Sequence, residues 1–267
     1  MVSTETVIAF LRDPLVLQSG GSFDRRKIII AANRIGPPMK LLYWRRLEQL
    51  GYLPDFSSSN AEDALQGIQR FGAPQVEIFF VSHRWLRPST DASLAHPDDE
   101  ASTKAKALVE FSTWRRDWVR RRHGFLPEIY FWIDYCCFDQ GNSSINMAML
   151  PIWIASCERV LCIETHDYHE RAWCRLELLL SYAFNFSDHY TVIDPAFQAS
   201  ASHDGREETH ILKRPIVGCL TDPSDAKHIE ALEQLACGFQ PASIDRVSGR
   251  RLPLAEFDTT PVRCYRL

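Results

Sequence analysis

Between residues 76 and 193 the chain alternates short apolar runs with longer helical stretches, and this order limits the fold more than any other feature. Residues 76–82 (V-E-I-F-F-V-S) are almost continuously apolar, as a strand buried on both faces of a parallel sheet must be. The pattern predicts further strands at 129–134, 159–163 and 190–193, with helices at 101–122, 144–157 and 171–184. It therefore predicts an α/β fold, a flavodoxin-like parallel sheet with helices on both faces.

The two flanking segments carry less information. Apolar residues at helical spacing predict helices at 6–11, 25–32 and 39–50, and Ser57 to Asn60 offer an N-cap for a short helix that ends near Phe71-Gly72. After a polar loop over 194–212 we expect a fifth strand at 216–220, a closing helix at 225–237 and an irregular tail. The expected organisation is an N-terminal helical extension (1–75), an α/β domain (76–193) and a C-terminal extension that completes the sheet (194–267).

Composition excludes several classes of partner. The net charge of −4 gives no bulk attraction to nucleic acid or to an anionic membrane. The arginines clustered over 115–122 are attributed to a solvated helix face. No apolar run approaches the roughly 18 residues that a membrane span needs, and no signal peptide follows Met1. With the eight cysteines inside predicted strands and helices, we expect reduced thiols and a cytoplasmic protein.

Polar side chains follow three successive strands of the predicted sheet. The carboxyl ends of parallel strands open onto one edge of a sheet, so these side chains can converge although they are far apart in sequence. The clusters are Ser82-His83-Arg84-Trp85, then Asp134-Tyr135, then Glu164, His166, Asp167 and His169. Each has a simpler explanation, because His83 can be a core histidine, Trp85 a packing residue and Asp134 a loop cap. Their joint position favours a functional site.

Trp173 and Glu177 lie one turn apart on the third predicted helix, on the same face. An aromatic plane beside a carboxylate suits a ligand with a cationic ring. The alternative is an exposed glutamate on an amphipathic helix.

Two other chemistries are weaker. Cys157, Cys162, His166, His169 and Cys174 form a set that contains zinc-ligand residue types, but their spacing fits no tight C-x-x-C knuckle, and we predict no metal site. A nucleophilic Cys136 or Cys137 activated by His83 is also open, although neighbouring cysteines at a buried strand end usually serve packing.

These residues resemble the TIR (Toll/interleukin-1 receptor) domain superfamily. Plant-type TIR domains carry a Trp-Cys-x-x-Glu-Leu segment, which Trp173, Cys174, Glu177 and Leu178 match. Their first strand ends in a serine before a polar or basic loop, as at Ser82, and their second strand ends in an aspartate, as at Asp134.

The chain is also similar to the fungal heterokaryon-incompatibility domain, a divergent relative. Its Trp-Ile-Asp-x-x-Cys-x-x-Gln segment is matched by Trp132, Ile133, Asp134, Cys137 and Gln140, and its Arg-x-Trp-x-x-x-Glu segment by Arg171, Trp173 and Glu177. The resemblance covers residues 76–193. It departs from TIR domains after the second strand, where Cys136 to Asn142 replace a glycine-bearing loop, and in the long acidic stretch 85–102.

The resemblance implies an NAD+ hydrolase or ADP-ribosyl cyclase that cleaves the nicotinamide–ribose bond in signalling, innate immunity or cell death. Glu177 would be the catalytic residue, and no cofactor beyond the substrate NAD+ is implied. The residues that would contact NAD+ are Ser82, His83, Arg84, Trp85, Asp134, Tyr135 and Trp173. TIR catalysis often needs self-association, so a homo-oligomer is expected. The alternatives are a non-catalytic signalling module and a nucleoside or nucleotide N-glycosyl transferase.

Overall fold

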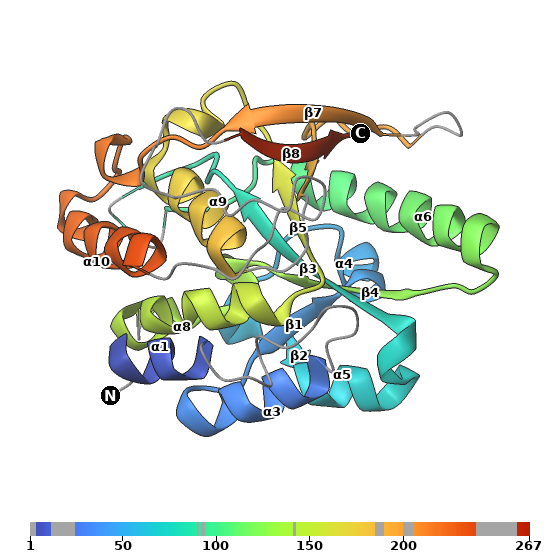
Figure 1. Ribbon diagram of the computed structural model, residues 1–267. Coiled ribbons are helices and arrows are strands. Elements are labelled where there is room, and N and C mark those ends of the chain that lie inside the picture. Colours follow the sequence, from blue (N-terminus) through green and yellow to red (C-terminus); the bar gives the residue numbers. More distant parts are fainter. Residues whose placement is uncertain are drawn as a thin grey trace.

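The computed structural model describes residues 4–11, 25–89, 91, 94–140, 143–184, 190–199, 205–238 and 261–267. An eight-stranded sheet in the order β2-β1-β4-β3-β5-β6-β8-β7 forms its centre (Figure 1). The strands are β1 (Lys40–Tyr43), β2 (Glu62–Asp63), β3 (Val76–His83), β4 (Glu128–Trp132), β5 (Arg159–Ile163), β6 (Tyr190–Ile193), β7 (Arg206–Ile211) and β8 (Pro261–Arg266). The α-helices are α1 (Thr4–Leu11), α3 (Arg25–Ile35), α4 (Trp44–Leu50), α5 (Ala64–Phe71), α6 (Thr103–His123), α7 (Asp134–Cys137), α8 (Ser143–Ser156), α9 (Ala172–Phe184) and α10 (Ala226–Gly238). The short 3-10 helices are η1 (Phe56–Ser58), η2 (Ala73–Gln75), η4 (Tyr168–Glu170), η5 (Pro215–Val217) and η6 (Pro223–Asp225).

The parallel strands confirm the predicted flavodoxin-like α/β architecture. In chain order they are β3, β4, β5, β6 and β8, and in the sheet they run β4-β3-β5-β6-β8, which is the order 2-1-3-4-5. The direction of winding reverses between β3 and β5. In such sheets ligands bind at this switch point, beyond the carboxyl ends of the strands.

The strands and helices of the middle segment form where the hydrophobic pattern predicts them. β3 is central, and all but one of its residues are buried. Phe80 stacks on Trp132 of β4 with ring centroids 4.9 Å apart, while Phe79 meets Phe111 of α6 edge to face at 5.2 Å. Because β-α-β crossovers are right-handed, α6 covers one face of the sheet, and α8 and α9 cover the other (Figure 1).

The prediction of a helix at 39–50 is wrong for its first half. Residues 40–43 form β1, which pairs antiparallel with β4, and α4 begins only at Trp44. The adjacent Leu41 and Leu42 both have no exposed surface. A strand inside a covered sheet can bury both neighbours, whereas an amphipathic helix at the surface buries one stripe.

The N-cap predicted at Ser57 to Asn60 is also wrong, because α5 starts later. Its cap is Asp63, whose side chain accepts a hydrogen bond from the Leu65 backbone N–H at 2.9 Å. The helix ends at Phe71, as expected, and Gly72 follows with a φ of 86°.

The C-terminal segment differs most from the prediction. Residues 216–220 do not form the fifth strand: Pro215 opens the 3-10 helix η5 instead, and only a single bridge joins Cys219 to Arg171. The fifth parallel strand is β8, in the tail expected to be irregular, and β7 lies in the segment expected to be a loop. Strands from both flanks therefore join the sheet, and the proposed division at residues 75 and 193 stays a prediction.

The eight cysteines, all of which lie in the described part of the chain, are thiols rather than disulfides. Among the helices that the structure describes, none is both long and apolar enough to span a bilayer.

Candidate functional site

The parallel strands β3 and β4, together with the helix α9, bring the candidate residues to the switch point of the sheet. Ser82 and His83 end β3 and lie in register with Cys162 and Ile163 at the end of β5. Asp134 follows β4, the neighbour of β3 on its other side, and begins the short helix α7. The helix α9, which follows β5, carries Glu177 toward β3.

Glu177 is bound inside the protein at this edge. The residue is 9% exposed, and the Ser82 hydroxyl donates to its Oε2 at 2.6 Å. Ser82 Oγ lies 2.5 Å from the Tyr168 hydroxyl, which also donates to Cys162 Sγ at 3.4 Å. The expected alternative, an exposed glutamate on an amphipathic helix, is therefore wrong.

A second polar chain runs beside the first. His83 Nε2 lies 3.1 Å from Asp134 Oδ1, and the Trp85 indole N–H donates to the other oxygen of the same carboxylate at 2.8 Å. On its other ring nitrogen, His83 faces the Lys104 ammonium group at 3.2 Å. Lys104 also donates to the backbone carbonyls of Arg84 and Pro97.

Burial sets the protonation of these groups. It raises the pKa of Glu177 well above its usual range, and the Asp134 charge adds to the shift. It also lowers the pKa of Lys104 to about 8. Burial and then the Lys104 charge lower the pKa of His83. A neutral His83 fits its contacts, because Nε2–H donates to Asp134 while Nδ1 accepts from Lys104.

Asp134 is the ionised member of the pair. Burial opposes its charge, but hydrogen bonds from His83 and Trp85 lower the pKa of Asp134. The two carboxyl groups of the site thus differ, since Glu177 favours its neutral form and Asp134 its charged form. Environments that separate two carboxyl pKa values are typical of acid–base and glycosyl-transfer sites.

Trp85, Arg87 and His96 lie over this edge of the sheet. Arg87 and His96 pair as an isolated antiparallel bridge. The Trp85 and His96 rings both pack edge to face against Tyr135, with ring centroids 5.5 Å and 5.0 Å from the Tyr135 centroid, respectively. Asp98 then caps α6, because its two carboxylate oxygens accept from the backbone N–H groups of Lys104 and Ala105 at 2.9 Å each.

Arg84 and Trp173 are held by residues outside the two polar chains. Arg84 Nη1 forms an ion pair with Asp167 at 2.8 Å. The Trp173 indole N–H donates to Asp225 Oδ2 at 2.8 Å, which ties the start of α9 to the segment before α10. Six of the eight predicted residues therefore contact at least one other member of the set: Ser82, His83, Trp85, Asp134, Tyr135 and Glu177. Arg84 shares the neighbour Lys104 with His83, and Trp173 is fixed from the C-terminal side.

Sequence reasoning missed two residues of this network, Lys104 and Tyr168. Lys104 had a signal, because Leu108 and Phe111 follow it at the spacing of one buried helix face. Tyr168 lies in a polar stretch without periodicity, and nothing there distinguishes it from a surface tyrosine.

The cysteine alternatives find no support in the geometry. Burial raises the pKa of Cys136 well above its usual range and that of Cys137 to about 12, so neither is disposed to form a thiolate. His83 is bound to Asp134 and Lys104. Of the residues weighed as a zinc set, Cys157, Cys162 and Cys174 are buried, whereas His166 is exposed.

Comparison with protein-family models, with curated proteins and with solved structures finds no match to this chain. The resemblance to TIR and heterokaryon-incompatibility domains therefore stays a prediction from the motifs.

Proposed function

We propose that this protein is a TIR-like NAD+ glycohydrolase or ADP-ribosyl cyclase, in which Glu177 acts on the nicotinamide–ribose bond. The observation that carries the proposal is the position of Glu177. It is a buried carboxyl group at the switch point of a parallel sheet, held by Ser82 and next to the His83–Asp134 pair.

The chemistry needs a carboxyl group of this kind. Nicotinamide is cationic in NAD+, so it can leave as a neutral base without a proton donor. Positive charge then develops on the ribose, and a carboxylate placed beside it in a site of low dielectric stabilises that charge. The approach of the cationic ring also lowers the pKa of Glu177, so that the group ionises when the substrate binds.

The remaining residues would bind the rest of the nucleotide. Trp85 and Tyr135 offer aromatic surface for a ring, and a cation over an indole gains about 0.5–2 kcal/mol. Arg84 would exchange the Asp167 carboxylate for the pyrophosphate, because phosphate accepts the same forked hydrogen bonds. His83 and Asp134 would hold the ribose hydroxyls, and Trp173 would face the base from α9.

Substrate entry would require Trp85 and the described residues packed against it to move. His83 is 7% exposed and Glu177 is 9% exposed, so a nucleotide cannot reach them while Trp85 is bound to Asp134. Release of the Arg84–Asp167 ion pair by the pyrophosphate would be the first step of this opening.

The test is to incubate the purified protein with NAD+ at high concentration and to measure released nicotinamide. Glu177→Gln keeps the size and the neutral hydrogen bonding of the side chain but cannot ionise, so we expect it to be inactive and folded. Glu170→Gln is the matched control, because Glu170 is exposed on η4 near the same helix, and it should retain activity. Full turnover by Glu177→Gln would remove the residue from the mechanism.

A non-catalytic interaction module is the second candidate, and one observation favours it. Glu177 and Tyr168 both hydrogen-bond to Ser82, and such contacts are those of a purely structural network. Product analysis separates the candidates. ADP-ribose or its cyclic form indicates a hydrolase or cyclase, base exchange indicates an N-glycosyl transferase, and no product from NAD+ indicates the module. A homo-oligomer and a role in signalling, immunity or cell death belong to the proposal in the first case.

A further inference from the structure

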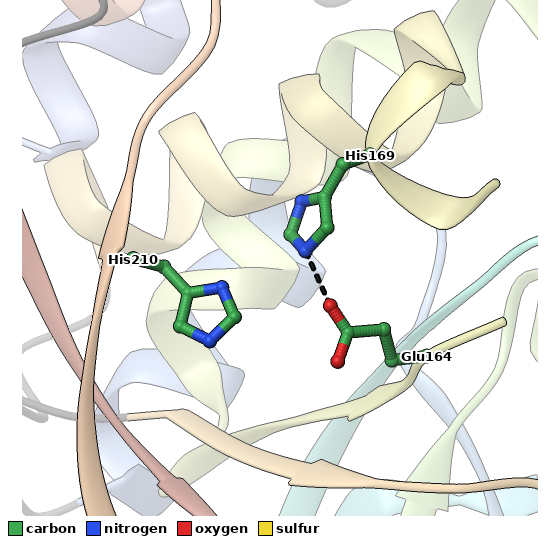
Figure 2. A group of neighbouring side chains, drawn as sticks. All are labelled: Glu164, His169 and His210. Carbon is green, nitrogen blue, oxygen red and sulfur yellow. Dashed lines mark hydrogen bonds and ion pairs between the residues drawn. The ribbon is translucent and has the colours of Figure 1, made fainter. Parts of the chain in front are cut away.

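Three potential metal ligands, two from the segment after β5 and one from β7, converge beside the antiparallel strands β7 and β8. Glu164 follows β5, His169 lies in η4 and His210 lies in β7 (Figure 2). One ligand atom from each side chain lies within 4.8 Å of the other two. His169 Nε2 is 2.5 Å from Glu164 Oε1, and the two imidazole rings are 5.4 Å apart between centroids.

The strand geometry explains why His210 faces this point. Side chains two residues apart on a strand share a face, so Glu208 and His210 both project from the same side of β7. Glu208 Oε2 lies 3.5 Å from His210 Nε2. β8 pairs with β7 and brings Arg266 to the same group, where its guanidinium contacts Glu164 and, at 3.1 Å, Glu208.

The charges of this group suit a cation. Glu164 and Glu208 supply two negative charges and Arg266 one positive charge, which leaves a net charge of −1 when the histidines are neutral. Arg266 contacts Oε2 of Glu164, whereas Oε1 faces His169. The arginine therefore orients the carboxylate and leaves one oxygen directed at the imidazoles, as residues that support metal ligands do.

We propose that Glu164, His169 and His210 bind a divalent metal ion of the Zn2+ class, with water in the fourth position. Two histidines and one carboxylate are a common zinc ligand set, with bonds of about 2.0–2.2 Å. Tetrahedral bonds of that length place the ligand atoms about 3.4 Å apart. Side-chain rotation would bring the more distant ligand atoms to that separation and would open the 2.5 Å contact between His169 and Glu164, which the ion replaces.

Metal binding would join the antiparallel strands β7 and β8 to the segment that leads into α9. Glu164 and His169 precede this helix, and Arg175 in its first turn donates to the His169 carbonyl at 2.6 Å. Metal binding at this site does not depend on the proposed NAD+ cleavage. Of the zinc-type residues noted from the sequence, this site contains His169 alone.

The experiment is Zn2+ titration of protein stripped with a chelator, followed by calorimetry, with Co2+ as a spectroscopic probe of coordination. We expect one saturable site of micromolar affinity and Co2+ absorption bands of tetrahedral intensity. His210→Ala and His169→Gln should each weaken binding by at least about 100-fold. His166→Ala is the matched control, because His166 is exposed and lies only three residues from His169, and it should bind as the wild type does.

The melting temperature gives a second readout. It should rise with Zn2+ concentration in the wild type and in His166→Ala, but not in the two ligand variants. Circular dichroism establishes that each variant is folded before it is compared. Absence of saturable binding at submillimolar Zn2+, or equal loss in His166→Ala, would overturn the site.

Discussion

Glu177 is surrounded by groups that make its charge costly. Burial and the nearby Asp134 carboxylate both disfavour ionisation, while the Ser82 hydroxyl compensates only in part. A carboxyl group in this state responds strongly to any cation placed next to it. The same property that fits the proposed chemistry therefore makes the stability of the protein depend on pH.

The first prediction concerns this pH dependence. The folded state holds the Glu177 proton more tightly than the unfolded state, and this preference stabilises the folded protein. The stabilisation from protonated Glu177 is fully present below the usual glutamate pKa. It is lost as pH rises toward the raised pKa, by up to about 1.4 kcal/mol per pH unit. Urea unfolding from pH 5 to pH 8 should show Glu177→Gln gaining stability relative to the wild type. Parallel curves, as expected for Glu170→Gln, would contradict the buried neutral carboxyl.

Lys104 is the residue that organises the loop above the site. It has no exposed surface, and its ammonium group serves the carbonyls of Arg84 and Pro97 as well as His83. Lys104→Met keeps the apolar stem but leaves these acceptors without a donor. We expect a loss of about 1–3 kcal/mol in the free energy of unfolding.

The same substitution should raise the pKa of His83, because the Lys104 charge helps to lower it. An NMR titration of the imidazole measures this shift. Lys106→Met removes an exposed charge from the same helix and should change neither quantity. An unchanged pKa of His83 in Lys104→Met would contradict the electrostatic interaction between the two residues.

At the residue scale, the sequence located most of the candidate site. Ser82, His83 and Asp134 could be placed because each follows an apolar run that has to be a buried strand. Helical spacing to Leu108 and Phe111 could have indicated that Lys104 is buried, but not which carbonyl groups it contacts. Tyr168 could not be placed, because its role comes only from three-dimensional neighbours.

At the scale of secondary structure, backbone hydrogen bonds join the residue after Gly218 to the start of α9. The backbone N–H of Ala172 donates to the Cys219 carbonyl at 3.0 Å, and the Cys219 N–H donates to the Glu170 carbonyl at 2.7 Å. Gly218 permits this approach, since a Cβ there would lie 2.6 Å from Ala172 Cα.

Gly218→Ala should therefore destabilise the protein. Its backbone angles are ordinary, so the cost is a steric clash with backbone atoms, about 1–3 kcal/mol. Thermal or urea unfolding measures the effect. Gly238→Ala is the control, because open space surrounds that position, and it should stay within about 0.5 kcal/mol of the wild type. Equal stability of the two variants would contradict this packing.

The strands that the pattern missed lie toward the edges of the sheet. β1, β7 and β8 pair with strands distant in sequence, and their extended conformation depends on the hydrogen bonds to those partners. The central β3, β4 and β5 bury both faces and therefore have a local apolar signature. Periodicity could identify those strands, whereas pairing at the edges leaves no local signal.

At the scale of the whole molecule, the fold, the candidate site and the proposed metal site meet along one side of the sheet. The carboxyl ends of β3, β4 and β5 carry the two polar chains, and the antiparallel strands β7 and β8 reach the loop after β5. Trp85 and His96 cover the site on the side of Tyr135. Under the proposed function, movement of these residues would admit a nucleotide without disturbing the sheet.

The central claim is that the Glu177 carboxylate cleaves a nucleotide glycosidic bond, and the rate of nicotinamide release from NAD+ tests it most directly. At equal high protein concentration, the account predicts release by the wild type and a fall of at least about 100-fold in folded Glu177→Gln. Equal rates for the two proteins, or no release from the wild type at any concentration, would contradict it.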